Sequence, residues 1–169
     1  HREKVRVGQE GDTLVLESIG RVQDREITVS YPKKTEFEEA SVDVVAGTVN
    51  LDDNFYAKKL EVSVAAGEFT NDSTITAEKA ELTVGTGNID LENLKVQNLE
   101  ADCGIGNIDL GIDGKEKDYD YEISCAAGAI DIGDSSFSGL GHEKKISNPG
   151  SSGKMTFDCG VGNITVDFE

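Results

Sequence analysis

The sequence is poor in several residue types on which common folds and sites depend. Its 169 residues include no Trp, one Met, two Pro, two His and three Cys. Apolar runs are only a handful of residues long, too short for a membrane-spanning helix. Basic residues are also scarce: 16 Lys and Arg face 33 Asp and Glu, for a formal net charge of −17. This balance argues against a nucleic-acid-binding protein, because phosphates require a basic face.

The few basic residues gather at the start of the chain. Residues 1–34 hold seven basic and six acidic side chains, whereas residues 35–169 hold nine basic and 27 acidic ones. The last of the four Arg is Arg25. We therefore distinguish a near-neutral segment, residues 1–34, from a strongly acidic body, residues 35–169.

Glycine, by contrast, is abundant, and six of the 19 glycines mark an internal repeat. The shared pattern is apolar, polar, apolar, polar, apolar, small, any, Gly, any, apolar, polar, apolar. We number the matching segments repeats 1 to 6: ASVDVVAGTVNL (40–51), LEVSVAAGEFTN (60–71), AELTVGTGNIDL (80–91), LEADCGIGNIDL (99–110), YEISCAAGAIDI (121–132) and MTFDCGVGNITV (155–166). Their glycines are Gly47, Gly67, Gly87, Gly106, Gly128 and Gly162. The first five are separated by nearly equal steps of about 20 residues, and a longer step leads to the last.

Within each repeat, apolar and polar residues alternate with a period of two on both sides of the glycine. That alternation is typical of two strands joined by a sharp corner, and a helical stripe is absent from the sequence. A fixed step of about 20 residues would stack equivalent strands in parallel about 4.8 Å apart. The pattern therefore predicts an all-β fold, a parallel β-solenoid of about six coils with an N-terminal strand cap. An antiparallel meander is the alternative.

The predicted stacking gives two interior columns and a role for the glycines. The columns are Val44, Val64, Val84, Cys103, Cys125 and Cys159, and Val49, Phe69, Ile89, Ile108, Ile130 and Ile164. At each corner, glycine allows a positive φ or leaves room for the backbone of the next coil.

The ends of the chain are less regular than the repeats. Residues 13–17 and 26–31 alternate as two further strands, and we expect residues 1–34 to cover the first coil, since a bare coil end exposes unpaired strand edges. Residues 133–154 are rich in Gly and Ser, which predicts a loop or a partial cap near the last coil.

Segments such as LTVGTGNIDLEN, LEADCGIGNIDL and MTFDCGVGNITVDF resemble a bacterial adhesin-type domain family of unknown function. This family, also called toast-rack-like, is common in Gram-positive bacteria. The resemblance covers roughly residues 35–169, and the small-x-Gly-(Asn/Asp)-Ile-Asp corner is its most specific feature. It implies a parallel β-solenoid at the cell surface, outside the cytoplasmic membrane, and often behind an N-terminal membrane anchor. Since the sequence begins at His1 without a signal peptide, we expect that the full-length protein carries such an anchor upstream.

The cysteines Cys103, Cys125 and Cys159 fall in one interior column, where the earlier repeats have valine. Neighbouring strands would place their Cα atoms within disulfide range, yet in-register strands hold the Cβ vectors parallel, which suits the S–S dihedral poorly. We interpret them as buried structural thiols, with one disulfide, or a metal or catalytic site, as alternatives. The odd count leaves at least one thiol free or paired outside the chain.

The polar faces carry carboxylates in columns. One column holds Asp90, Asp109 and Asp131 together with Asn50, and the other holds Glu61, Glu81, Glu100 and Glu122. Stacked carboxylates repel one another, so Ca²⁺ or a cationic partner would relieve them. A single column nevertheless offers few of the six to eight oxygens that Ca²⁺ takes. We therefore interpret these columns as a solvated acidic face and predict no metal-binding residue.

Signals for catalysis are weak. Two GxG strings lack the third glycine and the helix of a dinucleotide-binding loop, and a single His142 with interior thiols cannot form a catalytic relay. We predict no catalytic or cofactor-binding residue and no cofactor. A polysaccharide-acting β-helix enzyme is an alternative. Such enzymes need Ca²⁺-binding Asp clusters and a base or a charge-stabilising Arg beside the groove, and no Arg follows Arg25.

Together, these features predict a non-catalytic extracytoplasmic binding or scaffold module, a surface adhesin of unknown ligand. An envelope-stress sensor domain that binds cationic peptides or divalent ions is the alternative, since some relatives are associated with responses to envelope stress and cationic antimicrobial peptides. The acidic body favours a cationic peptide or protein as partner, because its negative potential raises encounter rates with cations.

Overall fold

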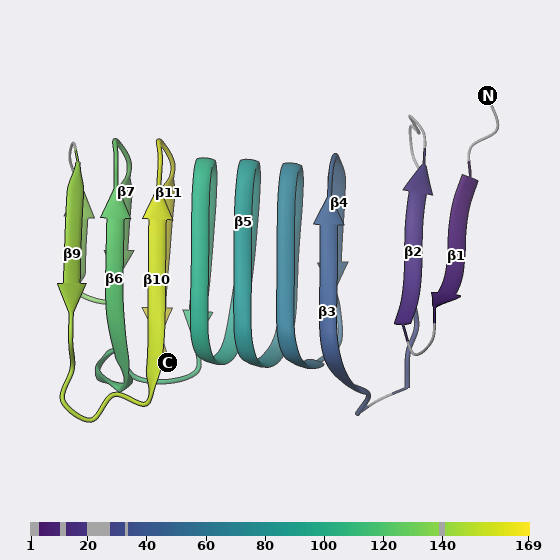
Figure 1. Ribbon diagram of the computed structural model, residues 1–169, viewed down its shortest axis with the longest axis horizontal. Helices are drawn as coiled ribbons and strands as arrows, with labels where there is room; N and C mark the ends of the chain where they lie inside the picture. The colour runs from purple at the N-terminus through teal and green to yellow at the C-terminus, as the bar shows by residue number, and fades with distance from the viewer. Residues whose placement is uncertain (1–3, 11–12, 20–27, 33, 139–140) are drawn as a thin grey trace. The chain divides into compact units, whose positions relative to one another are not determined.

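The computed structural model describes residues 4–10, 13–19, 28–32, 34–138 and 141–169. It is nearly all β, as predicted, with a curled open sheet (Figure 1). The chain divides into two parts, His1–Pro32 and Lys33–Glu169, and each is described by itself.

The smaller part contains β1 (Lys4–Glu10) and β2 (Thr13–Ile19), which pair antiparallel. Strand β2 includes the predicted strand at 13–17, whereas β1 was not predicted. The strand predicted at 26–31 is wrong for residues 28–31, which are not in a strand; residues 26 and 27 lie outside the described residues. Pro32 follows directly, and proline cannot donate to a strand ladder. The expected covering of the first coil by residues 1–34 stays a prediction.

The larger part consists of strands with one short helical turn. In chain order these are β3 (Glu36–Val44), β4 (Gly47–Leu51), β5 (Phe55–Ile112), the 3₁₀ turn η1 (Glu116–Asp118), β6 (Tyr119–Cys125), β7 (Ala129–Ile132), β8 (Ser135–Ser138), β9 (His142–Ile146), β10 (Gly153–Cys159) and β11 (Asn163–Phe168). Figure 1 shows β5 as a ribbon that winds back on itself in successive passes, side by side with β3 and β4.

Strand pairing follows the regular step of the repeats. Strand β3 pairs in parallel with β5, Ala40 opposite Leu60, and β4 does the same, Val49 opposite Phe69. The corner glycines stack so closely that a Cβ on Gly67 would clash with the carbonyl oxygen of Gly47. The same clash recurs at each later repeat glycine, which confirms that these corners need the space that glycine leaves.

The repeats are not stacked in sequence order. Strand β10 pairs in parallel with both β5 and β6, which places Cys159 between Cys103 and Cys125. Strand β11 likewise lies between β5 and β7, with Ile164 opposite both Ile108 and Ile130. The spatial order is therefore 1, 2, 3, 4, 6, 5, and the predicted order of the two columns is wrong at this end. Repeats 4, 5 and 6 have the same alternation of inward-facing apolar residues, with a cysteine before the corner. Their strands therefore allow any two of them to be neighbours.

Of the two predicted forms of residues 133–154, a loop or a partial cap, the described residues include two capping strands, β8 and β9. Strand β8 pairs antiparallel with β7, and β9 pairs antiparallel with β6, at the end of the sheet path. Phe137 on β8 lies opposite Ile130 and is 9% exposed. The Lys144 ammonium lies 4.7 Å from the centroid of the Phe137 ring. These short reversed strands end the parallel stack, which limits further edge pairing.

The interior matches the two predicted columns with one exception. All residues of the column from Val44 to Cys159 are buried, as are Phe69 and the isoleucines of the second column. Val49 is only half-buried. It belongs to repeat 1, which within the larger part has a neighbouring repeat on one side only.

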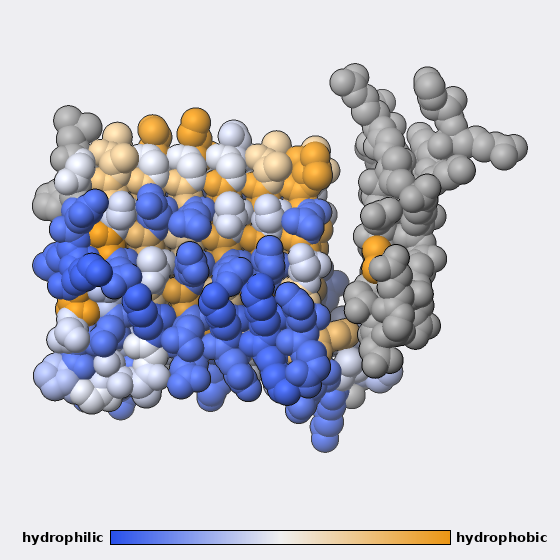
Figure 2. Space-filling model, viewed as in Figure 1, coloured by the Kyte–Doolittle hydropathy of each residue, from blue (hydrophilic) through white to orange (hydrophobic). Residues whose placement is uncertain are grey.

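The surface is divided between an uncharged edge and hydrophilic faces. The two residues before each corner glycine are all uncharged, and Val45, Ile105 and Val161 are exposed there. Figure 2 shows this edge as white to orange at the top of the larger part, where β3 turns into β4, with hydrophilic residues gathered below it.

Candidate functional site

A groove of about 640 Å³ crosses the ends of several neighbouring repeats. It is lined by Asn54, Asp72, Ser73, Thr74, Asp90, Leu91, Glu92, Asn93, Asp109, Leu110, Gly111, Asp167 and Glu169. Most of these residues lie at or just after the last strand positions of repeats 2, 3, 4 and 6. Because repeat 6 lies beside repeat 4, Asp167 sits opposite Gly111 and joins this surface.

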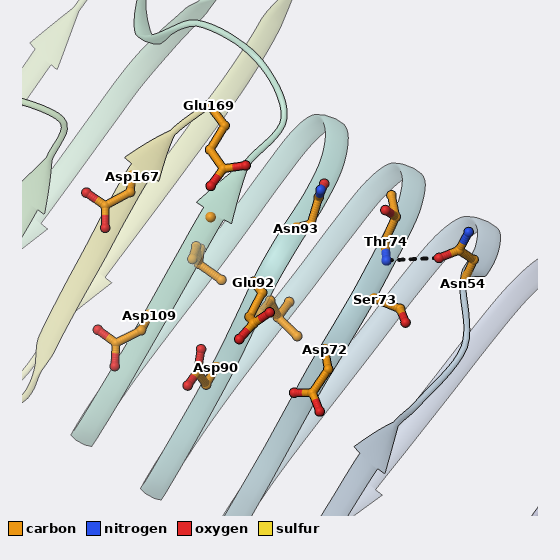
Figure 3. A pocket seen from close by; sticks show the side chains of 13 residues that line it. Asn54, Asp72, Ser73, Thr74, Asp90, Glu92, Asn93, Asp109, Asp167 and Glu169 are labelled. Carbon is orange, nitrogen blue, oxygen red and sulfur yellow. Dashed lines mark hydrogen bonds between the residues drawn. The ribbon is translucent and has the colours of Figure 1, made fainter.

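The groove is acidic and its lining contains no Lys or Arg. Six carboxylate side chains line it: Asp72, Asp90, Glu92, Asp109, Asp167 and Glu169. Figure 3 shows Asp72, Asp90 and Asp109 on three neighbouring passes of β5, with Asp167 on β11 beside them. None of the ion pairs that the structure describes involves any of the six. The site can therefore accept hydrogen bonds and positive charge from a ligand.

One wall of the groove carries amides. The Asn54 Oδ1 atom accepts a hydrogen bond of 3.1 Å from the backbone N–H of Thr74 (Figure 3). The Asn93 Oδ1 atom is buried and has no hydrogen-bond donor among the described residues. An unpaired buried acceptor is energetically costly.

The predicted glutamate column has a different environment from the groove. Lys59 lies 3.3 Å from Glu61 and 3.5 Å from Glu81, and Lys79 also pairs with Glu81. The hydrogen bond from Lys79 is the main cause of a lowered pKa at the Glu81 carboxyl. The repulsion expected in this part of the column is therefore relieved by lysines of the chain itself.

The same holds at the other end of the glutamate column. Thr156 lies between Glu100 and Glu122, so the predicted column is interrupted there. Lys145 and Lys154 bind Glu122 at 2.8 and 2.7 Å. Their hydrogen bonds lower the pKa of the Glu122 carboxyl to about 2. Glu122 on β6 therefore forms exposed ion pairs with both neighbouring strands, β9 and β10, an arrangement called the Glu122 clamp below.

The predicted aspartate column is interrupted by the same change of order. Thr165 of β11 lies between Asp109 and Asp131. Asp90 and Asp109 belong to the groove, whereas Asp131 is not among the lining residues. Sequence reasoning missed Asp72, Glu92, Asp167 and Glu169 as members of the site. An acidic residue just after repeats 2, 3 and 6 was the available signal.

Repeat 6, which lies between repeats 4 and 5, also brings two other carboxylates side by side. Asp158 on β10 lies opposite Asp102 on β5. Partial burial is the largest cause of a raised pKa at Asp102, and the charges of Glu100 and Asp158 add to it. This pair lies outside the groove lining.

The three cysteines are free thiols buried in the interior, where the sequence predicted them. The thiol of Cys159 donates a hydrogen bond of 2.9 Å to the carbonyl oxygen of Gly162. Burial is the main cause that raises the pKa of Cys159 to about 11, and it also raises the pKa of Cys103. Both thiols are therefore protonated at neutral pH.

The described residues contain no group of three or more His, Cys, Asp or Glu side chains placed to hold a metal ion. They also contain no helix with the length and apolar character needed to cross a bilayer.

The fold and the groove define the class of this protein: a nearly all-β domain built from stacked repeats, with an acidic groove across them. The chain belongs to the Toastrack DUF4097 family, whose model matches residues 4–141. The match begins well before residue 35, where the resemblance was expected to begin, and ends within the cap. No curated protein and no solved structure matches the chain.

Proposed function

We propose that this chain is a non-catalytic binding module that captures a cationic peptide or a basic segment of a protein in the acidic groove. The observation that carries the proposal is the distribution of lysines. Several carboxylates outside the groove, among them Glu61, Glu81 and Glu122, are paired with lysines, whereas none of the described ion pairs involves a groove carboxylate. The groove thus keeps its charge available for a partner.

The size and charge of the body support an electrostatic capture mechanism. Residues 35–169 hold 27 acidic and nine basic side chains, so a cation approaching from solution meets a negative potential. That attraction is screened over about 8–10 Å at ordinary ionic strength. Several carboxylates on neighbouring strands then hold ammonium or guanidinium groups by charge-assisted hydrogen bonds.

Calorimetry at low and high salt tests this function. A short peptide of alternating Lys and Ala should bind the chain, and salt should weaken the binding. The triple variant Asp90→Asn, Asp109→Asn, Asp167→Asn should reduce the affinity at least about tenfold, because three charged hydrogen-bond acceptors are lost.

The matched control for this experiment is Glu61→Gln with Glu81→Gln, since both carboxylates are already paired with lysines. This double variant should bind the peptide nearly as well as the parent chain. Equal loss of affinity in both variants would contradict a role for the groove and point to overall charge. Binding of Ca²⁺ in place of the peptide would favour the ion as ligand.

We also propose that the winding of β3–β11 is a parallel β-solenoid of about six coils, which serves as a rigid scaffold for the groove. The parallel registers of β3, β4, β10 and β11 with β5 support this interpretation, as do the stacked corner glycines. An experimental structure with antiparallel pairing within residues 60–132 would contradict it.

We further propose that the domain is displayed outside the cytoplasmic membrane as a tethered surface adhesin. The support is the family resemblance of the repeats and the strongly acidic body. Labelling of intact cells with a membrane-impermeant amine reagent should modify the full-length protein without lysis. Labelling only after lysis would contradict surface display.

Envelope-stress sensing is the alternative role, and the groove favours it to the same degree because a cationic antimicrobial peptide would bind there. The two roles differ in what the groove variant does in cells. Loss of adhesion with an unchanged stress response would favour the adhesin, and the reverse result would favour the sensor.

A further inference from the structure

The three thiols of the chain form one continuous column in the interior, although the cysteines lie far apart in the sequence. Cys159 lies opposite Cys103 on one side and Cys125 on the other, and all three are at most 2% exposed. The corresponding position is valine in repeats 1 to 3. The change of stacking order therefore makes Cys159 the middle thiol, a position that sequence order would give to Cys125.

We propose that this thiol column binds one soft monovalent metal ion between Cys159 and a neighbouring thiol, with Cu(I) as the biological class and Ag(I) as a stable probe. Soft sulfur ligands select such ions over hard cations. Two ligands suffice for linear coordination, so the absence of a larger ligand group in the described residues does not oppose this site.

The spacing of the strands suits linear coordination. Neighbouring strands lie about 4.8 Å apart, and side chains of equivalent rotamer keep that separation. Two metal–sulfur bonds of about 2.3 Å each, the length known for zinc thiolates, span nearly the same distance when they are collinear. A disulfide would instead require the two sulfur atoms to approach to about 2 Å, against the parallel Cβ vectors.

The surroundings of the sulfur atoms also suit a small bound ion. A Cβ on Gly162 would lie 2.6 Å from the Cys103 Sγ atom, and one on Gly128 would lie 2.7 Å from the Cys159 Sγ atom. The Cys103 and Cys159 thiols thus lie against the corner glycines of the neighbouring repeats. The two residues before each of these corner glycines are uncharged, so no neighbouring ammonium group at the corner opposes a cation.

Charge balance decides how the ion is held. Two protonated thiols and one monovalent ion give a thiolate–metal–thiol unit and release one proton to solvent. The bound unit is then neutral, as a dry interior requires, whereas two thiolates would leave one uncompensated negative charge. No oxidant or reductant takes part in this step.

Native mass spectrometry of the reduced chain with Ag(I) tests the proposal, and valine at the same position in repeats 1 to 3 supplies the variants. The parent chain should bind one ion tightly enough to withstand excess N-acetylcysteine. Cys159→Val should lower the affinity at least about 100-fold, because neither remaining thiol has a thiol neighbour. Cys103→Val and Cys125→Val should each keep affinity within about tenfold of the parent, because one adjacent pair remains.

Alkylation of the parent chain provides a second readout that does not depend on the folding of a variant. With Ag(I) bound, mild opening of the fold should leave Cys159 protected together with one neighbour, while the third thiol is alkylated. Equal alkylation of all three thiols would overturn the proposal, as would equal Ag(I) affinity in the three variants. A loss of two hydrogens by mass, with no metal uptake, would also overturn it and identify an oxidation site.

Discussion

At the scale of single residues, the corner glycines set how closely the repeats approach. A Cβ at Gly87 would clash with the carbonyl oxygen of Gly67, and backbone cannot move aside as a side chain can. The neighbouring residue Thr86 is exposed at the same corner. Substitutions at Gly87 and at Thr86 therefore distinguish the loss of space at the corner from a general effect of changing a corner residue.

We predict that Gly87→Ala lowers the free energy of unfolding by about 3 kcal/mol or more, at the upper end of what overpacking costs. Thr86→Ala should change it by less than about 0.5 kcal/mol, as is usual for surface sites. Urea denaturation of both variants is the measurement. Similar midpoints for the two variants would show that the corner has more room than the structure indicates.

Glu122 provides a pH-dependent contact at the same scale. Its carboxyl pKa is lowered to about 2 by hydrogen bonds from Lys145 and Lys154. A lowered pKa in the folded state means that the stabilisation is present above the ordinary glutamate pKa. It is lost as the pH falls towards 2.

We predict that Glu122→Gln flattens the dependence of melting temperature on pH between about pH 5 and pH 2. Glu100 lies in the same column but has no described lysine partner. Glu100→Gln should therefore keep a steeper dependence of melting temperature on pH than Glu122→Gln. An NMR titration of the Glu122 carboxyl gives the pKa directly. A pKa near the usual value of about 4.3 would contradict the clamp.

At the scale of elements, β10 and β11 join β5 to the strands of repeat 5. Among the described strands, β6 pairs with β10 and β9, and β7 pairs with β11 and β8. Repeat 5 therefore reaches β5 through repeat 6. Phe157 on β10 is 1% exposed and lies opposite Ala101 on β5 and Ile123 on β6.

We predict that Phe157→Ala destabilises the chain by about 3–5 kcal/mol and raises amide hydrogen exchange in β6 together with β10. Phe137→Ala, on the capping strand β8, should raise exchange mainly in β7 and β8. If the β6 amides of Phe157→Ala stayed protected while its β10 amides exchanged, the stability of β6 would not depend on repeat 6.

The sequence was sufficient for the repeats but not for their order. Alternation and spacing predict which residues are buried, because a strand face follows from its own side chains. Adjacency is different: Cys159 suits either Cys103 or Cys125 as a neighbour, so local patterning cannot choose. The longer step from Gly128 to Gly162 was the one signal that the chain returns by another route.

The candidate site was predicted only in part for the same reason. Asp90 and Asp109 were placed in one column from their alignment, and both line the groove. Asp167 joins them only through the insertion of repeat 6 beside repeat 4. The lysines that pair with Glu61 and Glu81 lie two residues before these carboxylates, on the same face of the strand. That spacing was visible in the sequence.

At the scale of the whole molecule, the net charge of −17 opposes a compact state through self-repulsion. We predict that raising NaCl from about 20 to about 300 mM increases the melting temperature, because screening relieves this repulsion more than it weakens the exposed ion pairs. Calorimetric melts of the parent chain measure the effect. A melting temperature that falls with salt would mean that the lysine pairs outweigh the repulsion.

An NMR titration of the ¹⁵N-labelled chain with the Lys/Ala peptide tests whether the acidic groove binds a cationic partner. Amide shifts should concentrate at residues 72–74, 90–93, 109–111 and 167–169, and added salt should reverse them. Shifts concentrated around Glu61 and Glu81, or no salt-sensitive shifts at all, would contradict it.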